Sequence, residues 1–150
     1  MTSFDPALVR DQADQFTLVK DRLWLHEQVT RYAPDAIIIV RVDGRVMYAN
    51  DRASTTFGYW PGELVGMAIE DLVPESAHED HVRHREAFIK APRYRQMGLP
   101  GMEIHGRRKG GEPFRCEVQL VPLAIEMGSV VAAYVRDLST PEHAGRPDDG

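Results

Sequence analysis

The stretch Gly44–Gly66, GRVMYANDRASTTFGYWPGELVG, contains more changes of direction than any other part of the chain. It opens with a turn and a short apolar strand, Val46–Asn50. A helical run then begins near Asp51 and stops at Gly58, and Pro61 marks the start of a second helix. Short elements in such quick succession are typical of small helices packed over one face of a sheet.

The segment before this stretch predicts the strand on which it packs. Ala36–Val40, AIIIV, is a continuous apolar run in which four of the five residues are β-branched. The sequence VDGR follows it, and Asp-Gly is a strong signal for a tight hairpin turn. We therefore expect Ala36–Val40 and Val46–Asn50 to pair as an antiparallel hairpin.

The segments after this stretch complete the fold. Two further helical pieces are predicted, AIEDLVP up to Pro74 and a longer one from Glu75 to Pro92. Three strands then follow, at Gly101–Lys109, Pro113–Glu126 and Ser129–Leu138. This order predicts an α+β fold, in which a five-stranded antiparallel sheet carries short helices on one face. The space between sheet and helices is a candidate small-molecule pocket.

The N-terminal segment, residues 1–33, is predicted to be an amphipathic helix. Pro6–Tyr32 contains no internal proline or glycine and has apolar residues at helical spacing on more than one side. Such a helix needs a partner, either the domain's own sheet or the same helix of a second copy. Trp24, Leu25 and Tyr32 are the candidate dimer contacts, with ordinary core packing as the alternative.

Composition and charge limit the number of domains, the kinds of partner and the cellular location that we expect. The 150 residues, 43% apolar and 27% charged, suit one globular domain at residues 34–140, followed by a polar tail at residues 141–150 that we expect to be disordered. The net charge of −5 argues against nucleic acid or an anionic membrane as a partner. The N-terminus lacks the apolar region of a signal peptide, and no apolar run approaches the length of a membrane span. We expect a cytoplasmic protein.

Four segments of the chain resemble a PAS domain, the sensory module of bacterial kinases, phosphodiesterases and transcription regulators. They are PDAIIIVRVDGRVMYANDRASTTFGY, PGELVGMAIEDLVP, GRRKGGEPFRCEVQLVPL and YVRDLST, in the family's order between Tyr32 and Thr140. The resemblance implies the PAS fold and a role in signal transduction, such as two-component regulation. It also implies a homodimer, formed through the helix ahead of the domain.

The resemblance assigns structural or signalling roles to two residues. Asn50 matches the residue that ties the second strand to the following helix, a role close to that of a helix cap. Asp137, together with Thr140, matches the motif at which such domains pass a signal to a C-terminal helix. Pro141 follows at once, so we expect an output domain or a partner signalling protein to receive the signal.

PAS domains hold haem, flavin, small acids or nothing, so only the individual residues can indicate a ligand. In haem-containing oxygen sensors of this family a helix histidine ligates the iron, and His81 matches it, with Met97 and Met102 near the opposite side. The alternative is a histidine on a polar helix and two methionines that line the core. Flavin adduct chemistry is not expected, because AIEDLVP lacks the required cysteine and Cys116 falls in a predicted strand.

A metal site and catalysis are both disfavoured. His78, His81, Glu75 and Asp80 have helical spacing, but no third ligand from elsewhere stands out, so a solvated helix face is expected. No nucleophile with a nearby base, phosphate-binding loop or pair of carboxylates is evident, so an enzyme is not predicted.

Three functional hypotheses result. The first is a sensory module that binds a small ligand or a protein partner and transmits a conformational signal through its terminal helices. The second is a haem-based gas or redox sensor with His81 as axial ligand. The third is a protein–protein dimerisation module without a ligand.

Overall fold

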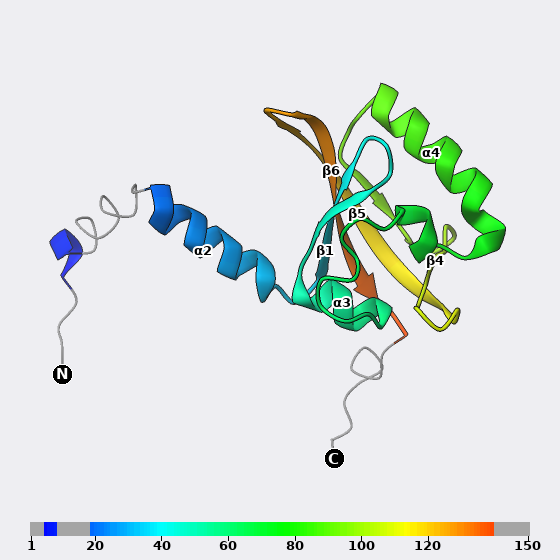
Figure 1. The fold of residues 1–150 in the computed structure, drawn as a ribbon, viewed down its shortest axis with the longest axis horizontal. Coiled ribbons are helices and arrows are strands. Elements are labelled where there is room, and N and C mark those ends of the chain that lie inside the picture. The colour runs from blue at the N-terminus through cyan, green and yellow to red at the C-terminus, as the bar shows by residue number, and fades with distance from the viewer. Residues whose placement is uncertain (1–4, 9–18, 140–150) are drawn as a thin grey trace, which may run out of the picture. The chain divides into compact units, whose positions relative to one another are not determined.

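The computed structural model describes residues 5–8 and 19–139 (Figure 1). Contacts within the chain divide it into two units, Met1–Tyr32 and Ala33–Gly150, and each is described here by itself. The predicted tail at residues 141–150 lies outside the described part.

In the first unit, helix α2 spans Val19–Arg31. Its last turn is closed by the backbone N–H of Tyr32, which donates to the carbonyl of Gln28 at 3.1 Å. Residues 6–8 are also helical, while residues 9–18 of the predicted Pro6–Tyr32 helix lie outside the described residues. No residue of α2 is buried, and its apolar side chains, such as Leu23 and Trp24, are exposed.

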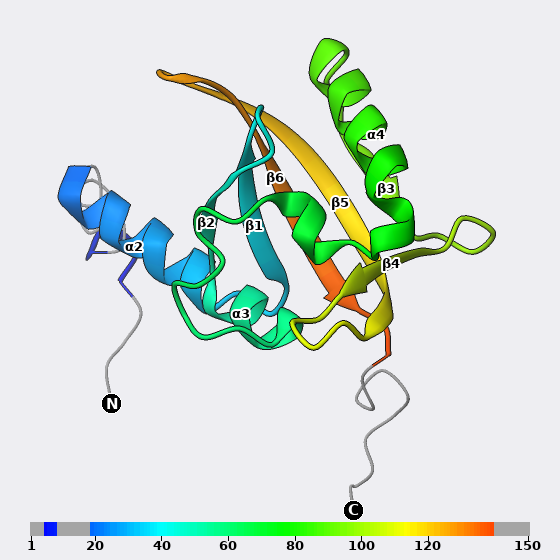
Figure 2. The same cartoon turned by 45° about the vertical axis from the view of Figure 1, so that its right-hand side comes forward.

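The second unit is built on an antiparallel sheet (Figures 1 and 2). Its strands are β1 (Ala36–Arg41), β2 (Val46–Ala49), β3 (Arg95–Met97), β4 (Ile104–Arg107), β5 (Pro113–Ile125) and β6 (Gly128–Asp137). The order across the sheet is β2-β1-β6-β5-β3, and β4 also pairs with β5. The predicted α+β fold with an antiparallel sheet is confirmed, but the sheet has six strands and not five, because β3 and β4 pair with successive segments of the same edge of β5.

The extra strand arises because the edge of the sheet is interrupted. Met97 of β3 pairs with Val118, whereas Ile104 of β4 pairs with Cys116. Between them Gly98 has a φ of 91° and lies so close to β5 that a Cβ would meet the carbonyl oxygen of Cys116 at 2.3 Å. Only glycine fits this backbone. The strand predicted at Gly101–Lys109 forms only over Ile104–Arg107, and β3 was not predicted.

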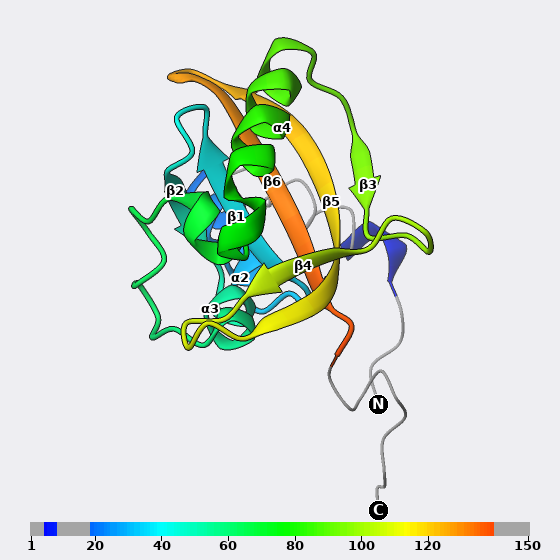
Figure 3. The ribbon, with the colours of Figure 1, turned by 90° about the vertical axis from the view of Figure 1, so that its right-hand side faces the viewer.

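The helices of this unit gather on one face of the sheet (Figure 3). They are α3 (Asp51–Phe57), the single 3-10 turns η1 (Ile69–Leu72) and η2 (Glu75–Ala77), and α4 (His78–Lys90). The helix predicted at Pro61 is wrong, because residues 60–66 form consecutive turns. Gly62 and Gly66 take φ values of 91° and 92°, which a right-handed helix does not permit.

The core lies between the sheet and these helices. The inward side chains of β1 contact buried residues from α3, the turns and the neighbouring strands: Val46, Ala53, Phe57, Leu64, Leu72, Phe114, Cys116, Ala133 and Val135. Phe57 and Phe114 meet edge to face, with ring centroids 5.4 Å apart. Gly106 lies beneath them, where a Cβ would come within 2.8 Å of the Phe114 ring. The interior is thus filled by side chains.

Asn50 joins three elements at the end of this core and is 1% exposed. Its Oδ1 accepts from the backbone N–H of Ala53 at 2.9 Å, which caps α3, and from the N–H of Ile37 at 2.9 Å. Its Nδ2 donates to the carbonyl of Asp35 at 3.1 Å. The side chain therefore fixes where β1 begins, where β2 ends and where α3 starts.

Replacing this side chain should destabilise the whole unit. We expect Asn50→Ala to lower the free energy of unfolding by about 2–4 kcal/mol, because it removes a cap and leaves buried backbone groups unpaired. Chemical denaturation measures this loss. Thr55→Ala, which removes one exposed bond to the carbonyl of Asp51, is the control and should cost far less. Equal losses in the two variants would contradict the assigned role.

Candidate functional site

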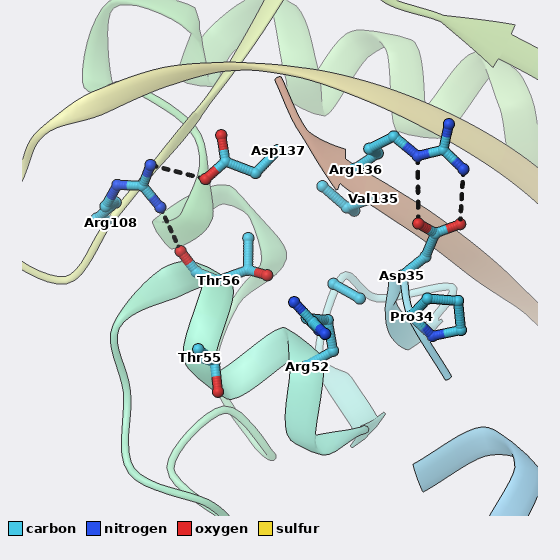
Figure 4. Close-up of a pocket in the computed structure, with 10 residues that line it drawn as sticks. Pro34, Asp35, Arg52, Thr55, Thr56, Arg108, Val135, Arg136 and Asp137 are labelled. Atoms are coloured by element: carbon cyan, nitrogen blue, oxygen red, sulfur yellow. Dashed lines mark hydrogen bonds and ion pairs between the residues drawn. The ribbon is translucent and has the colours of Figure 1, made fainter. Parts of the chain in front are cut away.

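The cleft described here lies at the end of the sheet where β1 begins and β6 ends (Figure 4). Its volume is about 510 Å³. It is lined by side chains from the start of β1, from α3, from the β4–β5 turn and from the end of β6: Pro34, Asp35, Ala36, Arg52, Thr55, Thr56, Arg108, Val135, Arg136 and Asp137. Antiparallel pairing of Ala36 with Val135 brings the two chain ends of the unit together here.

One wall of the cleft is an ion pair across the entry and exit strands. Arg136 Nε lies 3.3 Å from Asp35 Oδ1, and its Nη2 lies 3.5 Å from Oδ2. The hydrogen bonds and charge of Asp35 raise the pKa of Arg136. Both side chains reach solvent, so the pair adds little stability and mainly orients the two groups.

The opposite wall is a denser network around Asp137. Its Oδ2 accepts from Arg108 Nη2 at 2.8 Å, and its Oδ1 accepts from the backbone N–H and the hydroxyl of Ser139 at 2.8 and 2.7 Å. Arg108 Nη1 also donates to the carbonyl of Thr56 at 2.6 Å. One arginine therefore ties the C-terminal end of β6 to α3.

This network controls the protonation of Asp137. Burial by itself would raise the pKa of the carboxyl group, but the hydrogen bonds from Ser139 and Arg108 outweigh burial and lower it. The carboxylate is thus held ionised, and its negative charge keeps Arg108 in place.

A second polar cluster lies on the other side of the helical layer. Glu70, on η1, accepts from Arg85 Nε at 2.9 Å and contacts Nδ1 of His81 at 2.8 Å, both from α4. Arg85 also donates to the carbonyl of Val42 at 3.0 Å. Glu70 therefore connects His81 and Arg85 of α4 to η1. Arg85 also connects α4 to the β1–β2 turn, through its bond to the carbonyl of Val42.

The two acid–base groups of this cluster shift in the same direction for different reasons. Burial lowers the pKa of His81 and outweighs the hydrogen bond that His81 makes to Glu70, which acts in the opposite sense. For Glu70, burial would raise the pKa, but hydrogen bonds from Arg85 and His81 lower it. At neutral pH these two shifts keep Glu70 ionised and His81 largely neutral.

The other candidate haem residues lie on separate elements. Met97 is half-buried in β3, whereas Met102, in the loop before β4, is 52% exposed. Neither methionine nor His81 lines the cleft. Cys116 is buried in β5, and burial raises the pKa of its thiol to about 11, so it stays protonated and unreactive.

Comparison with known proteins places this architecture in a family. A family model of the PAS domain matches residues 34–140. The chain belongs to the PAS domain family. The match includes both polar clusters and excludes α2.

Solved PAS domains share the fold at low sequence identity. The PAS domain of an HTR-like protein from Haloarcula marismortui is 23% identical, with a TM-score of 0.65 over 79% of this chain and 98% of that one. A PAS domain from Colwellia psychrerythraea is 20% identical, with a TM-score of 0.66 over 78% and 97%. The PAS domain of nitrogen regulation protein NR(II) from Vibrio parahaemolyticus is 14% identical, with a TM-score of 0.60 over 75% and 97%.

The predicted dimer residues all lie on α2 or directly after it. Trp24 is 60% exposed, Tyr32 68% and Leu25 37%, each within the first unit. None of the described helices is long and apolar enough to cross a membrane. The described residues also include no group of three or more His, Cys, Asp or Glu side chains placed to hold a metal ion.

Sequence reasoning did not single out three arginines that the structure places at the cleft or in the second polar cluster. Arg108 belongs to the basic run GRRKGG, a pattern that looks like a solvated hairpin end, and nothing in its spacing points to Asp137. Arg85 and Arg52 fall on predicted helices without any distinguishing neighbour. Arg85 and Arg108 make contacts with residues far apart in the sequence, Arg85 with Glu70 and Arg108 with Asp137, and Arg52 reaches the cleft only through the placement of α3.

The lowered pKa of Asp137 predicts a pH-dependent contribution to stability. Because the folded-state pKa lies below that of the unfolded chain, about 4, the contribution is complete above that pH and is lost as the pH falls through the folded-state pKa. We expect Asp137→Asn to cost about 1.5–3 kcal/mol at pH 7 and progressively less below pH 4. Urea unfolding across this range measures the difference, with Asp71→Asn, an exposed carboxylate, as control. A cost that does not change with pH would contradict the assignment.

Proposed function

We propose that this PAS domain is a cytoplasmic sensory module that acts as a homodimer and passes conformational changes to its terminal segments. The observation that carries the proposal is the junction at the end of the sheet. Asp35, directly before β1, and Asp137, the last residue of β6, lie on one cleft and are each held by an arginine.

The junction supports signal transfer because its contacts join elements that a signal would move. Arg108 holds the carboxylate at the end of β6 and the carbonyl of Thr56 in α3 at the same time. A shift of α3 would therefore pull on the segment that leaves the domain after Asp137. Signals of this kind act by changing the populations of two arrangements, without any catalytic group, so no enzymatic activity is assigned.

The homodimer is proposed to form through α2. Its apolar side chains, which include Val19, Leu23, Trp24, Leu25 and Val29, are exposed within their own unit. A helix with so many exposed apolar residues gains free energy when it packs against another surface. The same helix of a second copy offers a self-complementary surface, as a twofold dimer requires.

Truncating Trp24 should weaken this dimer. We expect Trp24→Ser to raise the dimer Kd about 30-fold or more, since losing a buried interface aromatic costs about 2 kcal/mol. Sedimentation equilibrium measures the change. Trp60→Ser is the matched control, because Trp60 is 74% exposed in a turn of the other unit. A wild-type protein that is monomeric at micromolar concentration would overturn the proposed dimer.

Haem binding is a second candidate function, and the contact between His81 and Glu70 favours it. A carboxylate that holds Nδ1 orients an imidazole as metal-ligating histidines require, and directs Nε2 toward a ligand. The two methionines fit less well, since Met102 is more than half exposed. The filled core also means that a bound haem would displace side chains such as Leu64 or Leu72.

An absorption spectrum distinguishes this candidate. A haem protein should show a Soret band after incubation with haemin, and the band should shift on addition of dithionite. His81→Ala should abolish the band, while His84→Ala, on the same helix, should retain it. Thermal unfolding of both variants verifies that they remain folded. A protein that takes up no haemin, or one whose spectrum is unchanged in His81→Ala, would exclude His81 as an axial ligand.

A further inference from the structure

The cleft at the end of the sheet carries an excess of positive charge in an acidic protein. Its lining includes Arg52, Arg108 and Arg136 but only two carboxylates, Asp35 and Asp137. The chain as a whole has a net charge of −5. Three arginines therefore line one cleft, although the molecule as a whole carries an excess of negative charge.

Two of the three arginines are already neutralised by a carboxylate of the cleft. Arg136 is paired with Asp35, and Arg108 with Asp137. These pairs show which chemistry the site accommodates, because in each the planar guanidinium faces a carboxylate group. The third arginine lacks such a counterpart.

Arg52 projects from α3 between the two ion pairs (Figure 4). Within the part of the chain that the structure describes, no hydrogen bond or ion pair holds its side chain. An exposed guanidinium that is neither paired nor packed makes no evident contribution to folding. Its five donors are available to an incoming anion.

We propose that this cleft binds a carboxylate group, with Arg52 as its anchor. A carboxylate fits because the neighbouring arginines bind the same group, and a guanidinium can hold it through two parallel hydrogen bonds. The volume of about 510 Å³ accommodates a small organic acid or an acidic side chain of a partner protein. The site lies outside the core and does not depend on the proposed dimer.

The location gives such binding a consequence. The bound carboxylate would lie next to Asp35, directly before β1, and Asp137, at the end of β6. Added negative charge there would compete with Asp137 for Arg108 and with Asp35 for Arg136. Occupancy of the cleft would thus weaken the two contacts that hold the terminal segments, which extends the proposed signalling function.

A titration of the full chain, followed by NMR of backbone amides and arginine side chains, tests the proposal. The probes are succinate and a hexaglutamate peptide, with the neutral analogues succinamide and a hexaglutamine peptide as controls. We expect saturable shifts at Arg52, Thr55 and Thr56 with an acidic probe, weaker at high salt. Arg52→Gln should raise the Kd about tenfold or more, whereas Arg93→Gln, another exposed arginine without a described partner, should not change it.

Each result decides a specific point. Saturable binding of succinate supports a small acid as ligand, and binding of the hexaglutamate peptide alone supports an acidic partner segment. No saturable shift with either acidic probe overturns the proposal, as does equal binding of the neutral analogues or unchanged affinity in Arg52→Gln. Binding of inorganic phosphate but not of carboxylates would overturn the assigned chemistry. Sedimentation of the same samples reports the dimer separately, so failure of one proposal leaves the other standing.

Discussion

The amide of Asn50 is the constraint on which the rest of the PAS unit depends. Its oxygen satisfies two backbone donors, one at the start of β1 and one in the first turn of α3, and its nitrogen satisfies the carbonyl of Asp35. Without this side chain, three backbone groups, two at the start of β1 and one in the first turn of α3, would lose their bonds to it in a largely buried region, at considerable cost. The same contacts also set the entry of the chain, because Asp35 immediately precedes β1. A single buried amide therefore determines both the fold and the position of one wall of the cleft.

The cleft follows from the pairing of β1 with β6. An antiparallel pair places the start of one strand beside the end of the other, so Asp35 and Asp137 come together although they are far apart in sequence. Their charges are balanced by arginines from different elements, Arg136 from β6 itself and Arg108 from the β4–β5 turn. Because Arg108 also holds α3, movement of the helical layer and movement of the chain exit are mechanically related. This relation, rather than any single residue, makes the end of the sheet suitable for transmitting a signal.

The sequence predicts the elements of this fold better than its sites. The hairpin around the Asp-Gly turn, the start of α3 near Asp51 and its end at Gly58 were predicted correctly, since local rules govern turns and caps. The helix expected at Pro61 was wrong, because a proline signals a first turn but does not reveal that Gly62 and Gly66 have positive φ values. The short β3 was missed because three residues give no periodicity, and the close approach of Gly98 to β5 is a tertiary contact. The partners of Arg85 and Arg108 could not be predicted either, because those pairs are also tertiary contacts.

The contrast between the core and the cleft bears on how this domain could respond to a ligand. Between sheet and helices, apolar side chains such as Leu64 and Phe57 are in mutual contact, so a molecule entering there must displace them and disrupt their packing. At the end of the sheet the groups are charged, partly solvated and held by exchangeable ion pairs, so a ligand can enter without opening the core. Binding there would act directly on the contacts of Asp35 and Asp137, whereas binding in the core would first act on the packing of β1, β6 and α3. A ligand in the cleft could therefore influence the contacts of Asp35 and Asp137 without the loss of core packing that a ligand between sheet and helices would cause.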